Sequence, residues 1–342
     1  MILNKLLKFD GDIYIFGTGA MGVNVLKELN KKKINIKGFI DNDILKRGKV
    51  LQGLRINKPE IINKESYIVI ASSWYLEIET QLKKIGLKKF DNYLYWEDFF
   101  GIYGDFDNWQ EAESLSRGYN SEIILNKVKS SLLKVKQGEA AYERDSVLFD
   151  KPDYSFPLIA SLLFIANSNG GDLNVLDFGG SLGSTYYECK KFFDFRKINW
   201  NVVEQEEFVR VGKEHFEDDT LKFYDNIQKC MQTKNIDVII FSSVLQYLED
   251  PYLILEEVIG EKVPFILFDK MPFNNKKEDR LSIQYVPPNI YDADYPVWIM
   301  SKEKLINFFY GKYNIFLEFE SHLKIKIDGE WKSYEGFLMK RG

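Results

Sequence analysis

The chain has 342 residues, and at about 100–200 residues per domain this length favours two domains. Hydrophobic residues make up 45% and charged residues 28%, a composition that builds packed cores and excludes a disordered chain. The net charge of −5 excludes the globally basic surface of a nucleic-acid-binding protein, and two histidines with two cysteines predict no metal site.

The first predicted element is a short apolar strand at residues 12–17, followed by a glycine-rich turn that contains Gly17, Gly19 and Gly22. An amphipathic helix runs to Leu29, and a second strand ends at Asp41. Glycines let a turn approach a phosphate closely, and an acid about 20 residues later suits a ribose. These four residues therefore form a candidate nucleotide or sugar-nucleotide site.

A further buried strand is predicted at Tyr67–Ser72, with a helix after it, and the pattern ends near Tyr95 with about four strands. We assign residues 1–100 to a Rossmann-like nucleotide-binding module. The module has no visible catalytic acid–base pair, which favours binding over redox chemistry. The alternative is a degenerate module used for dimerisation, so a homodimer stays open.

Residues 99–125 are rich in glycine, aromatic and Asp/Asn residues and show no strand alternation. A helix follows at Ser121–Lys136. We therefore expect residues 101–150 to form a helical junction and cap between two domains.

Residues 151–342 alternate strands with helices, which predicts a doubly wound parallel sheet. The chain then ends in two strands around Asp328-Gly329, a hairpin turn signal. The fold class expected is α/β with two Rossmann-like domains, the second closed by an antiparallel β-hairpin. Five strands are expected before the hairpin, at 175–179, 200–205, 221–225, 237–243 and 265–270.

The phrase VLDFGGSLG, at Val175–Gly183, carries the chemistry of this second domain. It resembles the cofactor loop of class I methyltransferases that use S-adenosyl-L-methionine (SAM), in which an acid near the strand end precedes a glycine-rich turn. The acid is Asp177, and the glycines are Gly179, Gly180 and Gly183. Ser181 stands where the family has its middle glycine, and it would be strained if that position needs a positive φ.

The resemblance implies further cofactor-binding residues at the ends of the following strands. Glu204, with Gln205 after it, would accept hydrogen bonds from the two ribose hydroxyls. Asp225 would contact the adenine amino group, and Ser242 and Ser243 would lie beside the methionine end. Taken singly, each acid could equally be a solvated loop carboxylate.

Two long phrases, Gly118–Asp150 and Arg280–Trp298, are similar to a methyltransferase family found in bacterial surface-polysaccharide gene clusters. The similarity covers about residues 105–342 and implies methyl transfer to a sugar or sugar-linked intermediate, a small-molecule or glycan-linked substrate. Three phrases of the first domain, FGTGAMG, GFIDND and IVIAS, resemble sugar-nucleotide-binding modules of bacterial glycan enzymes.

The segment Arg280–Trp298 is expected at the carboxyl edge of the sheet, where open α/β sheets bind ligands. Its aromatic and amide side chains suit a sugar ring, although a purely structural loop is the alternative. Arg144 could bind an anionic group or belong to a salt-bridge cluster, and Asp269 is the candidate general base. The candidate substrate residues of the segment are Gln284, Tyr285, Tyr291 and Tyr295.

A different class of function stays open: a non-catalytic sugar-nucleotide-binding or scaffold protein of the same pathway. Ser181 and the lack of an obvious base favour it. No stretch reaches the roughly 18 apolar residues of a membrane-spanning helix. The sequence therefore predicts no transmembrane segment and a cytoplasmic location.

Overall fold

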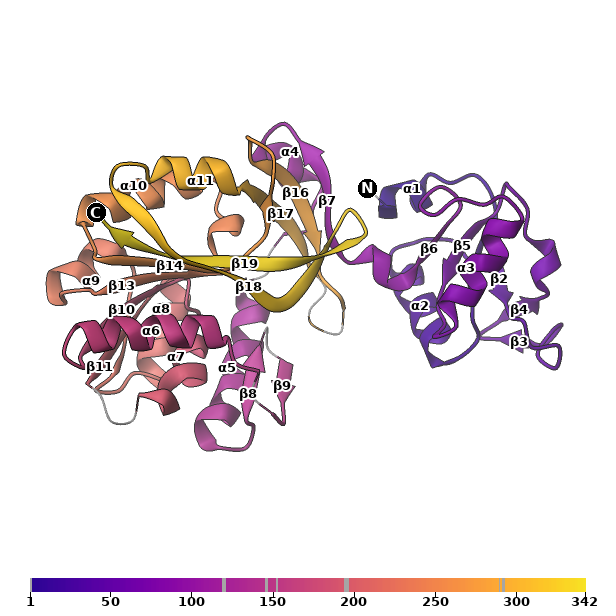
Figure 1. Cartoon of the computed structure of the whole chain (residues 1–342). Helices are drawn as coiled ribbons and strands as arrows, with labels where there is room; N and C mark the ends of the chain where they lie inside the picture. Colours follow the sequence, from indigo (N-terminus) through magenta and orange to yellow (C-terminus); the bar gives the residue numbers. More distant parts are fainter. Residues whose placement is uncertain are drawn as a thin grey trace. The chain divides into compact units, whose positions relative to one another are not determined.

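The computed structural model describes residues 2–118, 121–144, 147–151, 153–193, 197–288, 290 and 293–342 (Figure 1). The chain divides into two compact units, Met1–Gly101 and Ile102–Gly342, which we call unit 1 and unit 2. Among the described residues, no helix is long and apolar enough to cross a membrane.

Unit 1 is a small parallel α/β sheet. In chain order it contains α1 (Ile2–Leu7), β1 (Ile13–Phe16), α2 (Ala20–Lys31), β2 (Gly38–Ile40), β3 (Val50–Leu51), β4 (Leu54–Asn57), η1 (Pro59–Ile61), β5 (Tyr67–Ile70), α3 (Tyr75–Lys84), β6 (Tyr93–Tyr95) and η2 (Trp96–Phe99). The sheet order is β3-β4-β2-β1-β5-β6, with β3 antiparallel and the other strands parallel. The expectation of about four strands was too low, because β3 and β4 are too short to show alternation.

The central strand β1 is buried on both faces, which explains its unbroken apolar run. Successive side chains point to opposite faces of a strand. Accordingly, Ile15 packs in one cluster with Val25 of α2. Phe16 packs in another cluster with Leu82 of α3. The two helices therefore cover opposite faces of the sheet.

Unit 2 carries the remaining elements. They are β7 (Gly101–Phe106), α4 (Trp109–Ser114), α5 (Ser121–Gln137), β8 (Tyr142–Arg144), β9 (Val147–Phe149), α6 (Phe156–Ser168), β10 (Leu173–Phe178), α7 (Ser184–Cys189), η3 (Lys190–Phe192), β11 (Ile198–Val203), α8 (Glu206–His215), β12 (Leu221–Tyr224), α9 (Ile227–Thr233), β13 (Val238–Ser242), η4 (Leu245–Tyr247), α10 (Pro251–Glu261), β14 (Phe265–Met271), β15 (Phe273–Asn274), β16 (Arg280–Tyr285), β17 (Asp294–Ser301), α11 (Lys302–Phe308), β18 (Tyr313–Ile327) and β19 (Glu330–Arg341).

The large sheet of unit 2 begins with the order β12-β11-β10-β13-β14-β19-β18. The strands β10 to β14 pair in parallel, whereas β19 is antiparallel to both of its neighbours. This order, with a closing antiparallel hairpin, is that of the class I methyltransferase fold. The fold class expected from the sequence is therefore confirmed.

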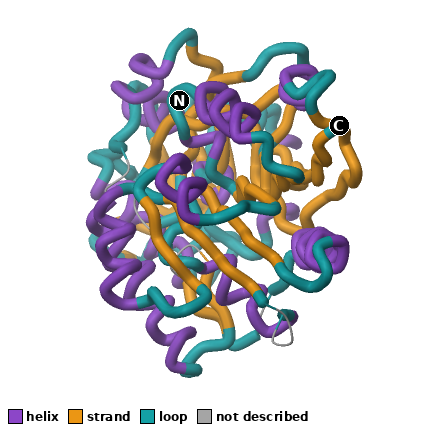
Figure 2. Tube along the Cα trace, turned by 90° about the vertical axis from the view of Figure 1, so that its left-hand side faces the viewer, coloured by secondary structure: helices purple, strands orange, loops and turns teal. Residues whose placement is uncertain are grey.

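Helices cover both faces of this sheet (Figures 1 and 2). Val175 of β10 lies in an apolar cluster with residues of α5, α6 and α8. Its neighbour Leu176 lies in a second cluster with residues of α9, α10 and α11. The alternation along β10 therefore fixes which helices lie on which side.

Two expectations about connecting segments were wrong. The stretch 99–125 contains strand β7, and the expected helical segment 101–150 also contains the hairpin β8–β9. The segment Arg280–Trp298 is largely the hairpin β16–β17 rather than a loop. β7 pairs with the far end of the long strand β18, at Ile327↔Ile102. A local sequence pattern cannot reveal a strand whose partner lies so far along the chain.

The sheet therefore continues past β18 in the order β7-β16-β17-β15. The hairpin β18–β19 is longer than expected because its strands run to the turn itself. Asp328 and Gly329 both have positive φ, at +53° and +85°. That is the geometry of a tight two-residue hairpin turn, as the Asp-Gly pair predicts.

Two helical glycines give a direct test of the packing of unit 2. A Cβ on Gly212 of α8 would lie 2.5 Å from the ring of Phe223, whereas one on Gly260 of α10 would meet nothing within 4 Å. We expect Gly212→Ala to lower the free energy of unfolding by about 1–3 kcal/mol through overpacking. Gly260→Ala should leave it unchanged or raise it by up to about 1 kcal/mol. Urea unfolding measures both, and equal effects would contradict the packing of α8 on β12.

Candidate functional site

The predicted cofactor residues of unit 2 lie at one edge of its sheet. Because β10, β11, β13 and β14 are parallel, their carboxyl ends meet there. Phe178 is paired with Val203 and with Phe241, and Ser242 is paired with Asp269. The loop after β10, the residues after β11 and the ends of β13 and β14 are therefore neighbours.

The glycine loop after β10 needs its glycines for space and for backbone conformation. Gly179 and Gly183 have φ values of +69° and +95°. A Cβ on Gly179 would lie 2.2 Å from the side chain of Val244, and one on Gly180 would lie 2.6 Å from the carboxyl of Asp177. The loop thus lies closely over the acid of β10 and against the segment after β13.

Ser181 adopts the positive φ for which the sequence analysis expected strain, at +55°. Its backbone N–H donates to Oε1 of Glu204 at 3.2 Å. Two more non-glycine residues at this edge, Ser243 and Lys270, also have φ of +55°. Such strained residues cluster at functional sites when the surrounding structure holds them in place.

Asp177 is buried beneath the glycine loop. Its Oδ2 accepts a hydrogen bond from Nε1 of Trp200 at 3.0 Å. Burial raises the pKa of Asp177 from 3.8 to about 7, although the Trp200 hydrogen bond acts to lower it. The carboxyl therefore changes its charge near neutral pH, and a cation bound next to it would favour the ionised form.

Glu204 follows β11 and joins that strand to the loop. Its Oε2 accepts from the backbone N–H of Gln205 at 2.7 Å, while Oε1 accepts from Ser181. Burial raises the pKa of Glu204, and these two hydrogen bonds oppose that rise. Each carboxylate oxygen keeps a second lone pair that a ligand hydroxyl can use.

The structure does not bring every predicted cofactor residue together. The carboxylate of Asp225 is exposed and binds Nζ of Lys229 in α9 at 2.6 Å. That hydrogen bond lowers the pKa of Asp225. In this structure Asp225 therefore acts as a surface ion-pair partner at the start of α9.

Asp269, the expected general base, is fully buried. Oδ1 accepts from Oγ of Ser155 at 3.4 Å and Oδ2 from Oγ of Ser242 at 3.1 Å, with Nζ of Lys270 3.7 Å away. A carboxylate enclosed by donors has neither the access nor the free lone pair to take a proton from a substrate. In this structure Asp269 is placed to orient the ends of β13 and β14.

The sequence analysis missed Glu188 of α7, a second buried acid beside this group. Its Oε1 accepts from the backbone N–H of Ser155 at 2.8 Å. Burial raises its pKa, while the charge of Lys270 acts to lower it. No local signal marks Glu188, because its partner is 33 residues away in the chain.

The predicted substrate residues meet the segment after β13. The hydroxyl of Tyr247 in η4 donates to Oε1 of Gln284 at 2.9 Å, and the rings of Tyr247 and Tyr295 pack edge-on at 5.3 Å. Tyr285 lies 6.3 Å from Tyr103, and burial raises its pKa to about 12. The hairpin β16–β17 is thereby tied to η4. Tyr291 and the side chain of Arg144 lie outside the described residues.

The glycine turn of unit 1 is also tightly built. Gly17 has φ of +122°, and a Cβ on Gly22 would lie 2.0 Å from the Gly17 carbonyl oxygen. Gly19 precedes α2 as its N-cap. Asp41 accepts hydrogen bonds from Thr18, from the backbone N–H of Asp43 and from Lys46. Burial acts to raise the pKa of Asp41, but these contacts hold it below its usual value.

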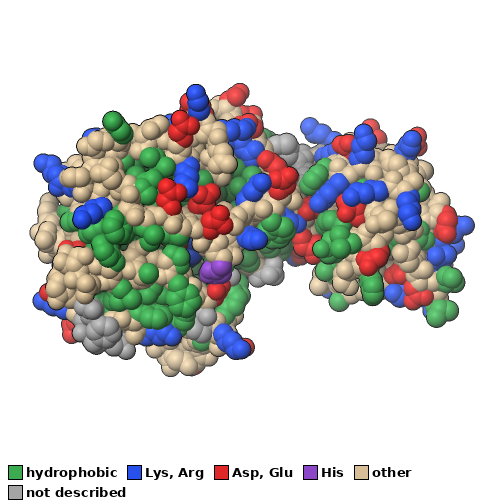
Figure 3. All heavy atoms as spheres, viewed as in Figure 1, with side chains coloured by type: hydrophobic (Ala, Val, Ile, Leu, Met, Phe, Trp, Pro, Cys, Tyr) green, Lys and Arg blue, Asp and Glu red, His purple; other side chains and the backbone are tan. Residues whose placement is uncertain are grey.

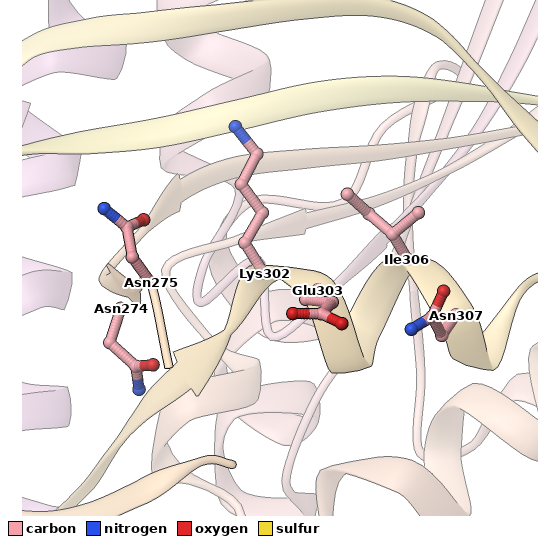
Figure 4. Close-up of a pocket in the computed structure, with 6 residues that line it drawn as sticks. All are labelled: Asn274, Asn275, Lys302, Glu303, Ile306 and Asn307. Atoms are coloured by element: carbon pink, nitrogen blue, oxygen red, sulfur yellow. The ribbon is translucent and has the colours of Figure 1, made fainter. Parts of the chain in front are cut away.

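Two other surfaces of unit 2 lie apart from these residues. A pocket of about 390 Å³ is lined by Asn274, Asn275, Lys302, Glu303, Ile306 and Asn307 (Figure 4). Its Lys302 binds Glu318 and Glu335 of the β18–β19 hairpin. Hydrophobic side chains also gather on the face seen in Figure 3. The exposed rings include Phe164 of α6, stacked on Phe316 of β18 at 4.6 Å.

Comparisons with known proteins give the following similarities. Residues 10–90 match the family model C2185-like, N-terminal. No curated protein matches the chain. An S-adenosylmethionine-dependent methyltransferase from Clostridium acetobutylicum is 15% identical, with 56% of this chain and 93% of that one covered and a TM-score of 0.35. CalS10, an amino pentose methyltransferase from Micromonospora echinaspora, is 10% identical, with 54% and 91% covered and a TM-score of 0.35.

The N-terminal domain of EvdMO1, in the presence of S-adenosylhomocysteine (SAH) and D-fucose, is 12% identical. Here 66% of this chain and 100% of that one are covered, with a TM-score of 0.37. TM-scores this low carry no weight for function. The class of the fold rests on the strand order, and the chemistry rests on the residues at the sheet edge.

The raised pKa of Asp177 makes stability depend on pH. Because the folded protein holds this proton more tightly than the unfolded chain, the favourable contribution is lost as pH rises from about 4 to about 7. We expect Asp177→Asn to gain stability relative to the wild type over this range, by up to about 1.4 kcal/mol per pH unit. Urea unfolding at several pH values measures it. Asp172→Asn, at an exposed site, should run parallel to the wild type, and parallel behaviour of Asp177→Asn would contradict the burial.

The strain at Ser181 gives a second prediction. We expect Ser181→Gly to raise the free energy of unfolding by about 1 kcal/mol, because glycine adopts a positive φ without cost. Ser168→Gly in α6 is the control and should lower it by about 0.5–1 kcal/mol. A loss of stability in Ser181→Gly would show that the serine is not strained.

Proposed function

We propose that unit 2 is a SAM-dependent methyltransferase whose cofactor lies at Val175–Gly183 and Glu204. The observation that carries the proposal is the glycine loop closed over the buried acid Asp177, with Glu204 bound to the loop. This arrangement stands at the carboxyl edge of a sheet with the class I methyltransferase strand order.

The charge of the site supports a cationic cofactor. Asp177 and Glu204 both have a pKa raised by burial, so the free protein tends to hold them neutral near neutral pH. A bound sulfonium favours their ionised forms. An anionic dinucleotide phosphate would have the opposite effect, which counts against NAD at this loop.

Methyl transfer needs position more than acid–base chemistry from the protein. The cofactor supplies the activated methyl group when bound. The chain holds the acceptor atom in line with that group and excludes water, and orientation of this kind can lower a barrier by roughly 7–11 kcal/mol. A hydroxyl acceptor also needs a base, for which the buried carboxylate of Asp269 is not placed.

The acceptor is proposed to be a sugar or sugar-linked intermediate of surface glycan biosynthesis in the cytoplasm. Tyr247, Gln284 and Tyr295 form an aromatic and amide surface beside η4, as a polar ring requires. Tyr285 adds a further ring on β16. The pathway itself rests on the sequence resemblance over residues 105–342.

Unit 1 is proposed to bind a nucleotide or sugar nucleotide at Gly17–Gly22, or to serve as a dimerisation module. The first role is supported by the close-packed glycine turn at the start of α2. Binding there would require the ligand to compete with Thr18 and Lys46 for Asp41. Melting temperatures with UDP-sugars test the first role, and light scattering tests the second.

The central experiment is calorimetry of SAM binding to the wild type and to Glu204→Ala. We expect micromolar binding by the wild type and a loss of at least about tenfold in Glu204→Ala, because charged hydrogen bonds are worth about 1.5–3 kcal/mol each. Glu206→Ala, at an exposed position in α8, is the matched control and should bind normally.

Absence of SAM binding by folded wild type at millimolar cofactor would overturn the methyltransferase proposal. SAM binding without transfer of a labelled methyl group to any sugar or sugar-nucleotide acceptor would favour the non-catalytic scaffold instead.

A further inference from the structure

The segment that follows β13 lies between the two parts of the proposed site. On one side, Val244 lies against Gly179 of the glycine loop. On the other side, Tyr247 contacts Gln284 and Tyr295 of the hairpin β16–β17. A residue between Val244 and Tyr247 is therefore close to both the loop and the hairpin.

Gln246 is that residue, and it is fully buried. Its Nε2 donates to Oγ of Ser243 at 3.0 Å, but its Oε1 has no hydrogen-bond partner among the described residues. A buried acceptor without a donor destabilises a folded protein. Such an atom persists where a ligand supplies the missing donor.

The groups around Gln246 indicate the charge of that donor. Ser243, which holds the Gln246 amide, donates its backbone N–H to the carbonyl oxygen of Asp269 at 2.9 Å. The carboxylate of Asp269 is buried, as are Asp177 and Glu188 near the same strand ends. Among the described residues, the cation beside Asp269 is Lys270. Three buried acids against one lysine leave this edge with an excess of negative charge, which favours a cationic donor.

We propose that Gln246 forms a subsite for the ammonium group of the cofactor's amino-acid part, with Oε1 as the acceptor. The subsite rests on the proposed function, because it takes SAM or its product SAH as the ligand. Ser243 holds the carboxamide in place from its strained backbone position. Gln246 is thus a positioning residue that fixes the methionine end of the cofactor and, through it, the direction of the methyl group.

The experiment compares two ligands that differ in this ammonium group. SAH carries it, whereas methylthioadenosine keeps the adenosine and the thioether and lacks the whole amino-acid part. We expect Gln246→Met, which is apolar and of similar size, to bind SAH about tenfold or more weakly while its affinity for methylthioadenosine changes less than about twofold. Gln246→Glu retains the acceptor and should bind SAH as tightly as the wild type or more tightly.

The control is Gln232→Leu, at an exposed position in α9, which should bind both ligands like the wild type. Wild-type affinity of Gln246→Met for SAH, or an equal loss for both ligands, overturns the subsite and leaves the proposed function standing. If Gln246→Met does not fold, a weaker SAH affinity of folded Gln246→Glu overturns the subsite. Failure of the wild type to bind either ligand overturns the proposed function and the subsite together.

Discussion

The burial of Asp177 under a loop that has no side chain above it is the constraint on which the rest of the site depends. The carboxyl fits only because Gly180 lacks a Cβ, and it is held by Trp200 from the neighbouring strand. Once this acid is in place, the loop has to turn through left-handed residues, and Glu204 is drawn to the backbone of Ser181. Conformation, charge and position of the loop therefore have a single origin.

The sequence was sufficient for the sheet and for the loop because both are local patterns. Alternating strands and helices predict the parallel part of unit 2, and Asp328-Gly329 predicts the closing hairpin. Ser181 was recognised as unusual before its φ was known. The strands β7, β16 and β17 could not be predicted, because their apolar side chains are explained only by partners far away in sequence.

The same limit applies to the candidate site. Residues that follow a strand directly, such as Glu204 and Ser242, can be found from spacing alone. Glu188, Tyr247 and Gln246 come together through tertiary contacts, and no spacing marks them. Asp269 illustrates the opposite error: its place at the end of β14 suits a base, whereas its burial and its donors suit a structural role. Position along a strand predicts proximity to a ligand, but it does not predict exposure.

The pairing of Ile102 with Ile327 also bears on how the chain folds as it is made. Strand β7 is synthesised at the start of unit 2, yet its partner β18 is close to the end of the chain. Contacts so distant in sequence raise the contact order and slow folding. During vectorial synthesis β7 must therefore wait as an unpaired strand while the core of parallel strands forms. The final step of folding on the ribosome is then the arrival of β18 and β19, which complete the sheet from both sides at once.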